Sequence, residues 1–314
     1  MSEPGERAGA LMRRAAIASL AVSLLLVSIK AFAYFASHSV AMLASMADSA
    51  LDLFTSSLNL FAIHSALAPA DKEHRFGHGK AEPLAGLAQA AFITASALFL
   101  VVQAVQRILA PQPVENSGQA LIVMAVSIVF AIALIVYQRM VVRRTNSLAV
   151  HADATHYFAD LVTNVGVVVA VILSSWVGWL LADPVIAIAV ALIMLVSALS
   201  VGRTSLDQLM DRELPDEDRA RIKRIVLAHD AVASLHDLKT RAAGLTTFIQ
   251  VHIEMDPQMR LAEAHAVSDA VERAILNAYP GAEVLIHQDP VGLEHPVEPG
   301  LADTTSGTPR YPSP

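Results

Sequence analysis

Two pairs of polar side chains interrupt apolar stretches of the sequence at identical spacing. Asp48 and Asp52 form one pair, and His156 and Asp160 form the other. If each stretch is helical, both side chains of a pair emerge on one face, one turn apart. A carboxylate at the centre of a bilayer costs about 2.5–3.5 kcal/mol on the insertion scale, so these faces must point inward and share a partner.

A divalent cation is the partner that suits these four side chains best. Three carboxylates and one imidazole supply hard-to-borderline ligands, a set that fits tetrahedral Zn²⁺ and tolerates Fe²⁺, Cd²⁺ or Mn²⁺. The alternative is that the four residues only cap or pair inside a helical bundle. Identical spacing in two apolar stretches favours the metal site.

The composition indicates a polytopic membrane protein. The chain has 314 residues, 54% of them hydrophobic, and a mean hydropathy of +0.51, whereas soluble domains contain about 45–50% apolar residues. Cysteine is absent, so any metal must be held by nitrogen and oxygen ligands. A net charge of −7 and the lack of a basic patch exclude a nucleic-acid partner.

Six apolar stretches are each long enough to cross the hydrocarbon core of a bilayer, which needs about 20 residues. They cover residues 15–35, 41–66, 84–109, 119–141, 148–175 and 180–202. Six crossings put both termini on one side, and the arginines and lysines of the N-terminus and of the second and fourth loops fall on that side. The positive-inside rule therefore makes both termini cytoplasmic.

Charges elsewhere in the apolar stretches are few. Lys30 and Arg107 lie near the opposite helix ends, where we expect their long side chains to reach the membrane interface. The stretches at 84–109 and 119–141 carry almost no internal charge, so we expect them to be a scaffold facing lipid.

A second polar cluster, Asp71, His74 and His78, follows the second apolar stretch. Gly77 and Gly79 argue against a continuous helix and indicate a loop that could wrap an ion. A solvated loop beside the membrane is the alternative interpretation.

The composition changes after the sixth apolar stretch, which predicts three parts: a six-helix transmembrane domain at 1–207, a cytoplasmic α+β domain at 208–292 and a disordered tail at 293–314. The tail is rich in Pro, Gly, Ser and Thr. The second part shows a helix at 215–228, strands near 232–241 and 245–255, a helix near 261–278 and a strand near 283–289.

The α-β-β-α-β order of the second part predicts a small ferredoxin-like, or metallochaperone-like, fold. Ala243-Gly244 is the expected hairpin turn between its middle strands. Polar side chains in or beside these elements form a third candidate metal cluster: His236, His252, His265, His287 and Asp289. His287 and Asp289 are two apart on a strand, so they share a face.

Four sequence features together carry a family resemblance. They are Asp48-x3-Asp52, His156-x3-Asp160, the loop PADKEHRFGHGKAEPLAGLAQA and the stretch VLIHQDP. Over about residues 12–292 the chain resembles the cation diffusion facilitators, in particular the bacterial branch that exports zinc and ferrous iron. The resemblance implies a homodimer in the bacterial inner membrane.

The resemblance also implies a role for each polar group. The transport site would be Asp48, Asp52, His156 and Asp160. A loop metal site would be Asp71, His74 and His78. A cytoplasmic two-metal site would be His236, His252, His265, His287, Gln288 and Asp289. An interfacial salt bridge of the dimer would join Lys80 and Asp211.

We therefore expect a transporter, not an enzyme, that exports Zn²⁺, and also Fe²⁺ or Cd²⁺, in exchange for protons by alternating access. His156 is the natural proton carrier, because a neutral imidazole binds metal and an imidazolium cannot, and Asp52 is expected to take part. Metal would also be a structural or regulatory ligand of the cytoplasmic domain.

Two other classes of protein would also place histidine and aspartate as this sequence does. An intramembrane metallohydrolase is disfavoured, since the sequence has no His-Glu-x-x-His helix. A membrane-tethered metal sensor without transport could use the C-terminal histidines alone. It would leave Asp48, Asp52 and Asp160 unexplained.

Overall fold

The structure is a computed structural model that describes residues 3–37, 40–109, 118–177 and 181–292. The chain divides into two compact units, one spanning Arg7–Leu209 and one that holds the residues from Met210 onward. The tail predicted at 293–314 lies outside the described residues.

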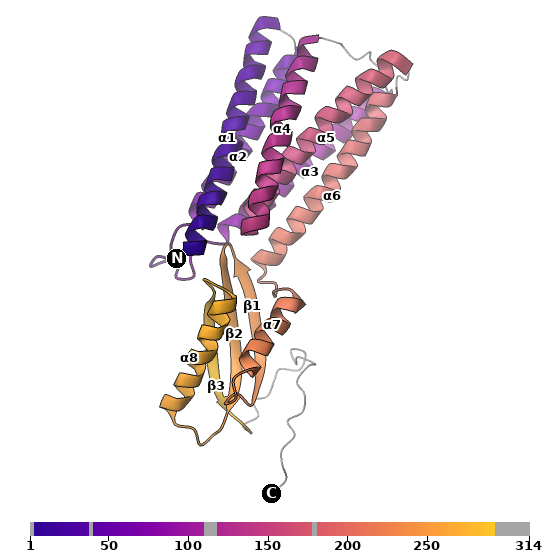
Figure 1. Cartoon of the computed structure of the whole chain (residues 1–314). Coiled ribbons are helices and arrows are strands. Elements are labelled where there is room, and N and C mark those ends of the chain that lie inside the picture. The colour runs from indigo at the N-terminus through magenta and orange to yellow at the C-terminus, as the bar shows by residue number, and fades with distance from the viewer. Residues whose placement is uncertain (1–2, 38–39, 110–117, 178–180, 293–314) are drawn as a thin grey trace. The chain divides into compact units, whose positions relative to one another are not determined.

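Among the described residues, the first unit contains six long helices (Figure 1). They are α1 (Glu3–Ser37), α2 (Val40–Ala66), α3 (Ala81–Leu109), α4 (Gly118–Thr145), α5 (Leu148–Val177) and α6 (Ala182–Leu209). The predicted six-helix membrane architecture is confirmed. Several helices are longer than the apolar stretches, because a helix can continue beyond the roughly 20 residues that the hydrocarbon core requires.

By length and composition, four helices of the described chain could cross a membrane: α1, α3, α4 and α6. The remaining two long helices, α2 and α5, are those that carry the polar pairs. Asp52, His156 and Asp160 are largely buried against other helices, which is where an intramembrane charge is tolerated.

Helices α3 and α6 make the most extensive contact in this unit. Small residues allow the close approach: a Cβ at Gly86 would lie 2.5 Å from Ser205 Oγ, and one at Gly202 would lie 3.4 Å from Ala90. Ile93 and Met194 are buried beside this contact, together with Ala159 of α5. Close backbone approach at small residues is a common way to pack membrane helices, since lipid offers no hydrophobic driving force.

The second unit is a small α+β domain. Its elements are α7 (Asp216–Leu227), β1 (Ser234–Ala243), β2 (Thr246–Met255), α8 (Leu261–Ala278) and β3 (Glu283–Pro290). The strands lie in the order β1-β2-β3, with β1 antiparallel and β3 parallel to β2. The predicted α-β-β-α-β order and the small α+β domain are confirmed, with shifts of only a few residues at the element ends.

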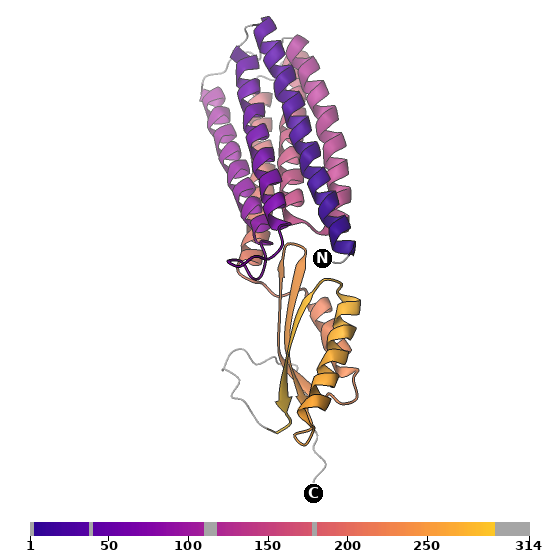
Figure 2. The ribbon, with the colours of Figure 1, turned by 90° about the vertical axis from the view of Figure 1, so that its left-hand side faces the viewer.

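Both helices of this domain cover the same face of the sheet (Figure 2). Alternation along β2 explains this, because Ile249, Val251 and Ile253 point into the core with α7 and α8. His252 and Glu254 are less buried and lie on the opposite face, which neither helix covers in the described chain. The sheet therefore has one structural face and one polar face.

The turn between β1 and β2 lies one residue later than predicted. Ala243 pairs with Thr246, so the loop residues are Gly244 and Leu245. Gly244 has a φ of 59°, a backbone conformation that favours glycine. Glycine thus marks the hairpin correctly but as the first loop residue.

The contact between α3 and α6 predicts that Gly86→Ala destabilises the protein by about 1–3 kcal/mol, because the new methyl group must displace the Ser205 hydroxyl or part the helices. Thermal unfolding of the detergent-solubilised chain measures this. Gly202→Ala is the matched control on the same interface, where the space is sufficient. Equal melting temperatures for both variants would contradict the tight contact.

Candidate metal sites

The intramembrane cluster joins α2 and α5 through His156. Its Nε2 atom lies 3.2 Å from Asp52 Oδ1 and 3.7 Å from Asp160 Oδ2. The candidate ligand atoms of these three residues all lie within 4.8 Å of one another. Their side chains are only 10%, 14% and 28% exposed, in the order His156, Asp52, Asp160. The three groups can thus close around one cation.

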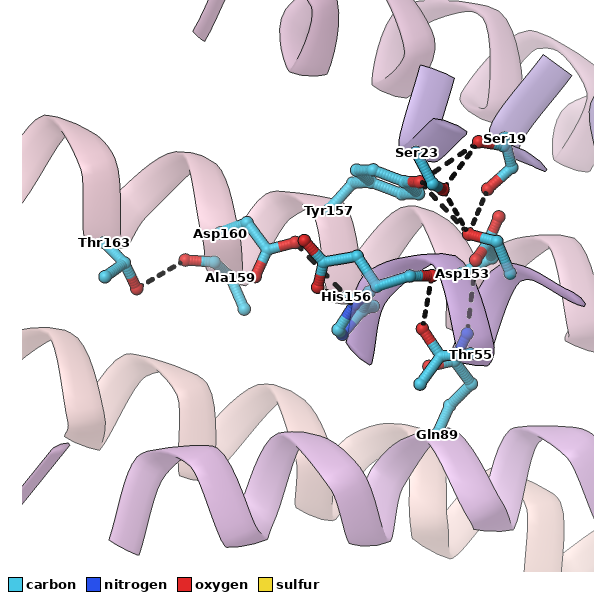
Figure 3. A network of polar contacts seen from close by, with 12 residues as sticks. Ser19, Ser23, Thr55, Gln89, Asp153, His156, Tyr157, Ala159, Asp160 and Thr163 are labelled. Carbon is cyan, nitrogen blue, oxygen red and sulfur yellow. Dashed lines mark hydrogen bonds and ion pairs between the residues drawn. The ribbon is translucent and has the colours of Figure 1, made fainter. Parts of the chain in front are cut away.

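Asp160 has a buried carboxyl oxygen, Oδ2, without a hydrogen-bond donor among the described residues. Figure 3 shows this carboxyl on the same side of α5 as His156, one turn farther along the helix. A buried acceptor without a donor is costly, and a cation bound there would satisfy it.

Asp48 lies outside this trio. It is one turn from Asp52 on α2, and its side chain is exposed in the structure. The charged groups that act on it are Asp52, Lys30 and His156. The structure therefore brings three of the four predicted transport ligands together, and the role of Asp48 stays a prediction.

A buried carboxyl that the sequence analysis missed lies next to this cluster. Asp153 is fully buried on α5 and accepts hydrogen bonds from Gln89 Nε2 of α3 at 3.2 Å and from Gln138 Nε2 of α4 at 2.6 Å. Its spacing of three residues from His156 places both on one face, visible in Figure 3. That spacing was available in the sequence and could have identified Asp153.

The expectation that α3 and α4 are only a lipid-facing scaffold is wrong. Gln89 and Gln138 are buried and aim their amides at Asp153. An uncharged amide suffices to donate to a buried carboxyl, so these apolar stretches can hold Asp153 without a charge of their own. An isolated glutamine in an apolar stretch gives little indication of such a role.

A cluster of hydroxyl groups ties α1, α2 and α5 together beside Asp153. Ser23 Oγ lies 2.6 Å from Tyr157 Oη and donates to Ser56 Oγ at 2.9 Å. Ser19 Oγ lies 3.1 Å from Ser56 Oγ. Figure 3 shows Ser19, Ser23 and Tyr157 close together. The cluster fixes the levels of the three helices relative to one another.

Glu82 is another buried acid that sequence reasoning missed. This residue of the first turn of α3 accepts hydrogen bonds from the Ser147 hydroxyl and, at 3.3 Å, from the backbone N–H of Ala149. The first N–H groups of a helix have no partner within the helix. Glu82 therefore caps the start of α5 from a different helix.

The loop cluster is brought together as predicted, and its backbone is not helical. Asp71 Oδ2 lies 3.3 Å from His78 Nε2, and Asp71 Oδ1 lies 3.3 Å from His74 Nδ1. The pKa of Asp71 is below its usual value, chiefly because the backbone N–H of His74 donates to the carboxylate and that of Glu73 adds to it. An ionised acid between two imidazoles suits a divalent cation.

The cytoplasmic cluster follows from the register of the sheet. His236 of β1 pairs with His252 of β2, which pairs with His287 of β3, so three imidazoles form one row across the polar face. Asp289 lies two residues along β3, where His252 Nδ1 donates to its Oδ2 at 2.9 Å. His236 Nε2 lies 3.5 Å from that oxygen, and His287 Nε2 lies 3.3 Å from Oδ1.

Asp289 is the anchor of this cluster. Burial alone would raise its pKa, but the hydrogen bond from His252 and the charges of the three histidines outweigh burial and hold the pKa below its usual value. Asp289 therefore remains ionised at neutral pH. Two acids that were not predicted lie nearby: Glu254 is 3.4 Å from His236, and Asp237 is 3.8 Å from His252.

Two predicted ligands of the cytoplasmic site are not in this cluster. His265 lies on α8, is 72% exposed and is 3.7 Å from Asp269. Gln288 donates to Ser268 Oγ of α8 at 2.8 Å, so its side chain lies on the helix-covered face of the sheet. Their assignments as ligands stay predictions.

The two charges of the predicted dimer salt bridge have contacts within their own units. Lys80 Nζ donates to the backbone oxygen of Leu209 at 3.3 Å. Asp211 Oδ1 lies 3.3 Å from Arg241 Nη1. The salt bridge between subunits stays a prediction.

Comparison with known proteins identifies the family. A model of the cation efflux transmembrane domain matches residues 16–210, and a model of the cation efflux protein cytoplasmic domain matches residues 214–291. The chain belongs to the cation efflux family. This is a family of transporters, and the prediction that the chain is not an enzyme is confirmed.

Curated relatives match along most of the chain. The cation-efflux pump FieF of Klebsiella pneumoniae is 44% identical over 293 residues, which is 93% of this chain and 97% of the relative. FieF of Escherichia coli O139:H28 is 46% identical over 285 residues, or 91% and 95%. A solved structure described as a zinc transporter, CzrB in its zinc form, is 34% identical and covers 27% of this chain and 98% of its own, with a TM-score of 0.26.

The amide clamp on Asp153 predicts that Gln138→Leu destabilises the protein by about 1–3 kcal/mol, because a buried acceptor loses its closer donor. Thermal unfolding in detergent measures the loss. Ser28→Ala is the control, since this exposed hydroxyl bonds only its own helix at Leu24. A Gln138→Leu melting temperature equal to that of wild type would contradict the clamp.

The row of imidazoles predicts pH-dependent zinc binding by the cytoplasmic domain. Ligand imidazoles must release their protons to bind metal, so affinity falls as the pH drops from about 7.5 to 5.5, while Asp289 stays ionised. His252→Ala, which removes the centre of the row, is expected to lower the number of Zn²⁺ ions bound. Calorimetry on the intact chain measures both. Unchanged zinc stoichiometry in His252→Ala would exclude the cluster as a site.

Proposed function

We propose that this chain exports divalent metal cations from the cytoplasm, with Zn²⁺ as the preferred cargo and Fe²⁺ or Cd²⁺ also accepted. The observation that carries the proposal is the trio of Asp52, His156 and Asp160 between two helices of a membrane domain. The FieF relatives, which are named cation-efflux pumps, support export as the direction of transport. Proposed ligands are these three residues together with Asp48.

The choice of metal follows from the ligand chemistry. Carboxylate oxygens and a single imidazole nitrogen form a hard-to-borderline set with four donors, which matches tetrahedral Zn²⁺. The same set accepts neighbouring divalent ions, so selectivity depends on the groups that orient the ligands. Asp153 lies one turn before His156, and its amide clamp fixes that part of α5.

Proton exchange follows from the position of His156. Its Nε2 atom lies between the carboxyl oxygens of Asp52 and Asp160. As an imidazolium it would pair with both acids and fill the place of the cation, and as a neutral imidazole it would offer a lone pair to the metal. Metal and proton therefore compete for one site, with His156 and Asp52 as the proposed proton carriers.

The orientation and assembly complete the proposal. Both termini lie in the cytoplasm of a bacterial cell, the membrane is the inner one, and the protein is a homodimer. The polar face of the C-terminal sheet supports the dimer, because neither α7 nor α8 covers it in the described chain. Metal bound at the histidine row would tighten the pair, and Lys80 and Asp211 would join the subunits near the membrane. The loop site of Asp71, His74 and His78 would be a further regulatory site.

The direct test is Zn²⁺ flux into proteoliposomes of the purified protein, with and without an imposed pH gradient. We expect flux that follows the gradient and is lost by at least about a hundredfold in Asp52→Ala, since removing one ligand of a metal site leaves the others uncompensated. The dimer should remain folded in this variant.

Asp230→Ala is the matched control, because it removes an exposed acid of the C-terminal domain. Near-normal flux in Asp52→Ala would refute the site. A wild-type protein that carries no zinc, iron or cadmium would refute transport and favour a membrane-tethered metal sensor.

A further inference from the structure

Lys30 is a buried basic residue that is not among the ligands of the metal site. It lies in α1, which is outside the α2–α5 pair that supplies the ligands, and its residue is only 7% exposed. A lysine that reaches the membrane interface keeps its ammonium in water. The reach of Lys30 to the interface stays a prediction, and a positive charge on so buried a residue is stabilised by an acidic partner.

The register of the helices places Lys30 beside the site. The Ser23–Ser56 hydrogen bond of 2.9 Å sets α1 and α2 at one level. The two helices are joined at residues 38–39, so they run in opposite directions. Lys30 is seven residues beyond Ser23, about 10.5 Å, and Asp48 is eight residues from Ser56, about 12 Å, in the same direction.

Lys30 also lies on the correct face of α1. A separation of seven residues is close to two full turns, so Lys30 shares the face of Ser23 that bonds Ser56 and Tyr157. Two acids of the site are within the electrostatic range of its ammonium, Asp48 and Asp160. A third helix thus places a positive charge within electrostatic range of carboxyl groups of the other two.

The net charge of the site gives Lys30 a role in both the metal-bound and the metal-free state. With His156 neutral, three ionised carboxylates and one divalent metal leave a net charge of −1, which Lys30 cancels. After the metal leaves and before His156 takes up a proton, the carboxylates would face one another without any cation if Lys30 were absent. Uncompensated charge is strongly unfavourable where water is largely excluded.

We propose that Lys30 is a tethered counter-cation of the transport site. Its charge repels a divalent cation and so lowers the affinity of the site for that cation. Once the cation has left, Lys30 pairs with Asp48 and Asp160. Lys30 is thus a positioning residue that promotes release, and it is not a metal ligand. The inference rests on the proposed transport function.

The test compares Lys30→Gln with wild type at about pH 8, with a Zn²⁺ gradient driving flux into proteoliposomes. Loss of the repulsion should lower KM by about tenfold and lower Vmax several-fold, because metal enters readily and leaves slowly. Lys30→Arg keeps the charge and should restore both values. A variant that is merely misfolded would have a lower Vmax without any decrease in KM.

Two controls make the assignment specific. Arg107→Gln removes a cation of another helix, one paired with Asp183, and should leave KM unchanged. Cd²⁺ titration of the detergent-solubilised chain should show tighter binding in Lys30→Gln, and no such effect when Asp52→Ala is already present, because coupling requires the intact site.

The outcomes separate this inference from the function on which it rests. An unchanged or raised KM in Lys30→Gln, or an equal decrease in Arg107→Gln, would overturn the role of Lys30 while transport stands. If wild type carries no metal, the Cd²⁺ titration decides: tighter binding in Lys30→Gln supports the counter-cation, and equal binding overturns it.

Discussion

The structure depends on a single constraint, which is that acids inside a membrane domain must always have a partner. Asp52 and Asp160 share His156, Asp153 is held by two amides, and Glu82 caps a helix. The partners of these acids differ from one another in whether they can be exchanged, and that difference matters for function. Amides and backbone N–H groups are permanent donors, whereas a metal ion and a proton are exchangeable. Among these described acids, those around His156 are therefore the ones whose proposed partners, a metal ion and a proton, can exchange.

Much of this architecture could be predicted from the sequence, because membrane helices and alternating strands follow from periodic burial. The spacing of four residues identified the Asp48–Asp52 pair of α2 and the His156–Asp160 pair of α5 for the same reason. The positions of individual side chains were harder to predict. Nothing in the pattern distinguishes Gln89 and Gln138 from other polar residues in apolar stretches, and their role appears only when α3 and α4 pack against α5.

Local alternation bears on one assignment that rested on the family resemblance. Residues two apart on a strand share a face, and adjacent residues do not. Gln288 lies between His287 and Asp289, so it must point away from both, and the structure places it against Ser268. The family resemblance grouped all three residues, whereas the strand geometry of one chain separates them.

The cap that Glu82 provides has a mechanical consequence. Because α3 holds the first turn of α5 through Glu82 and its second turn through Gln89, the two helices are joined by polar contacts in both of these turns. Between α2 and α5 the described polar contacts are hydroxyl bonds and the ligand trio itself. If the proposed transport proceeds by a rocking motion of α2 along this boundary, a metal ion held by the trio would connect the two parts that move.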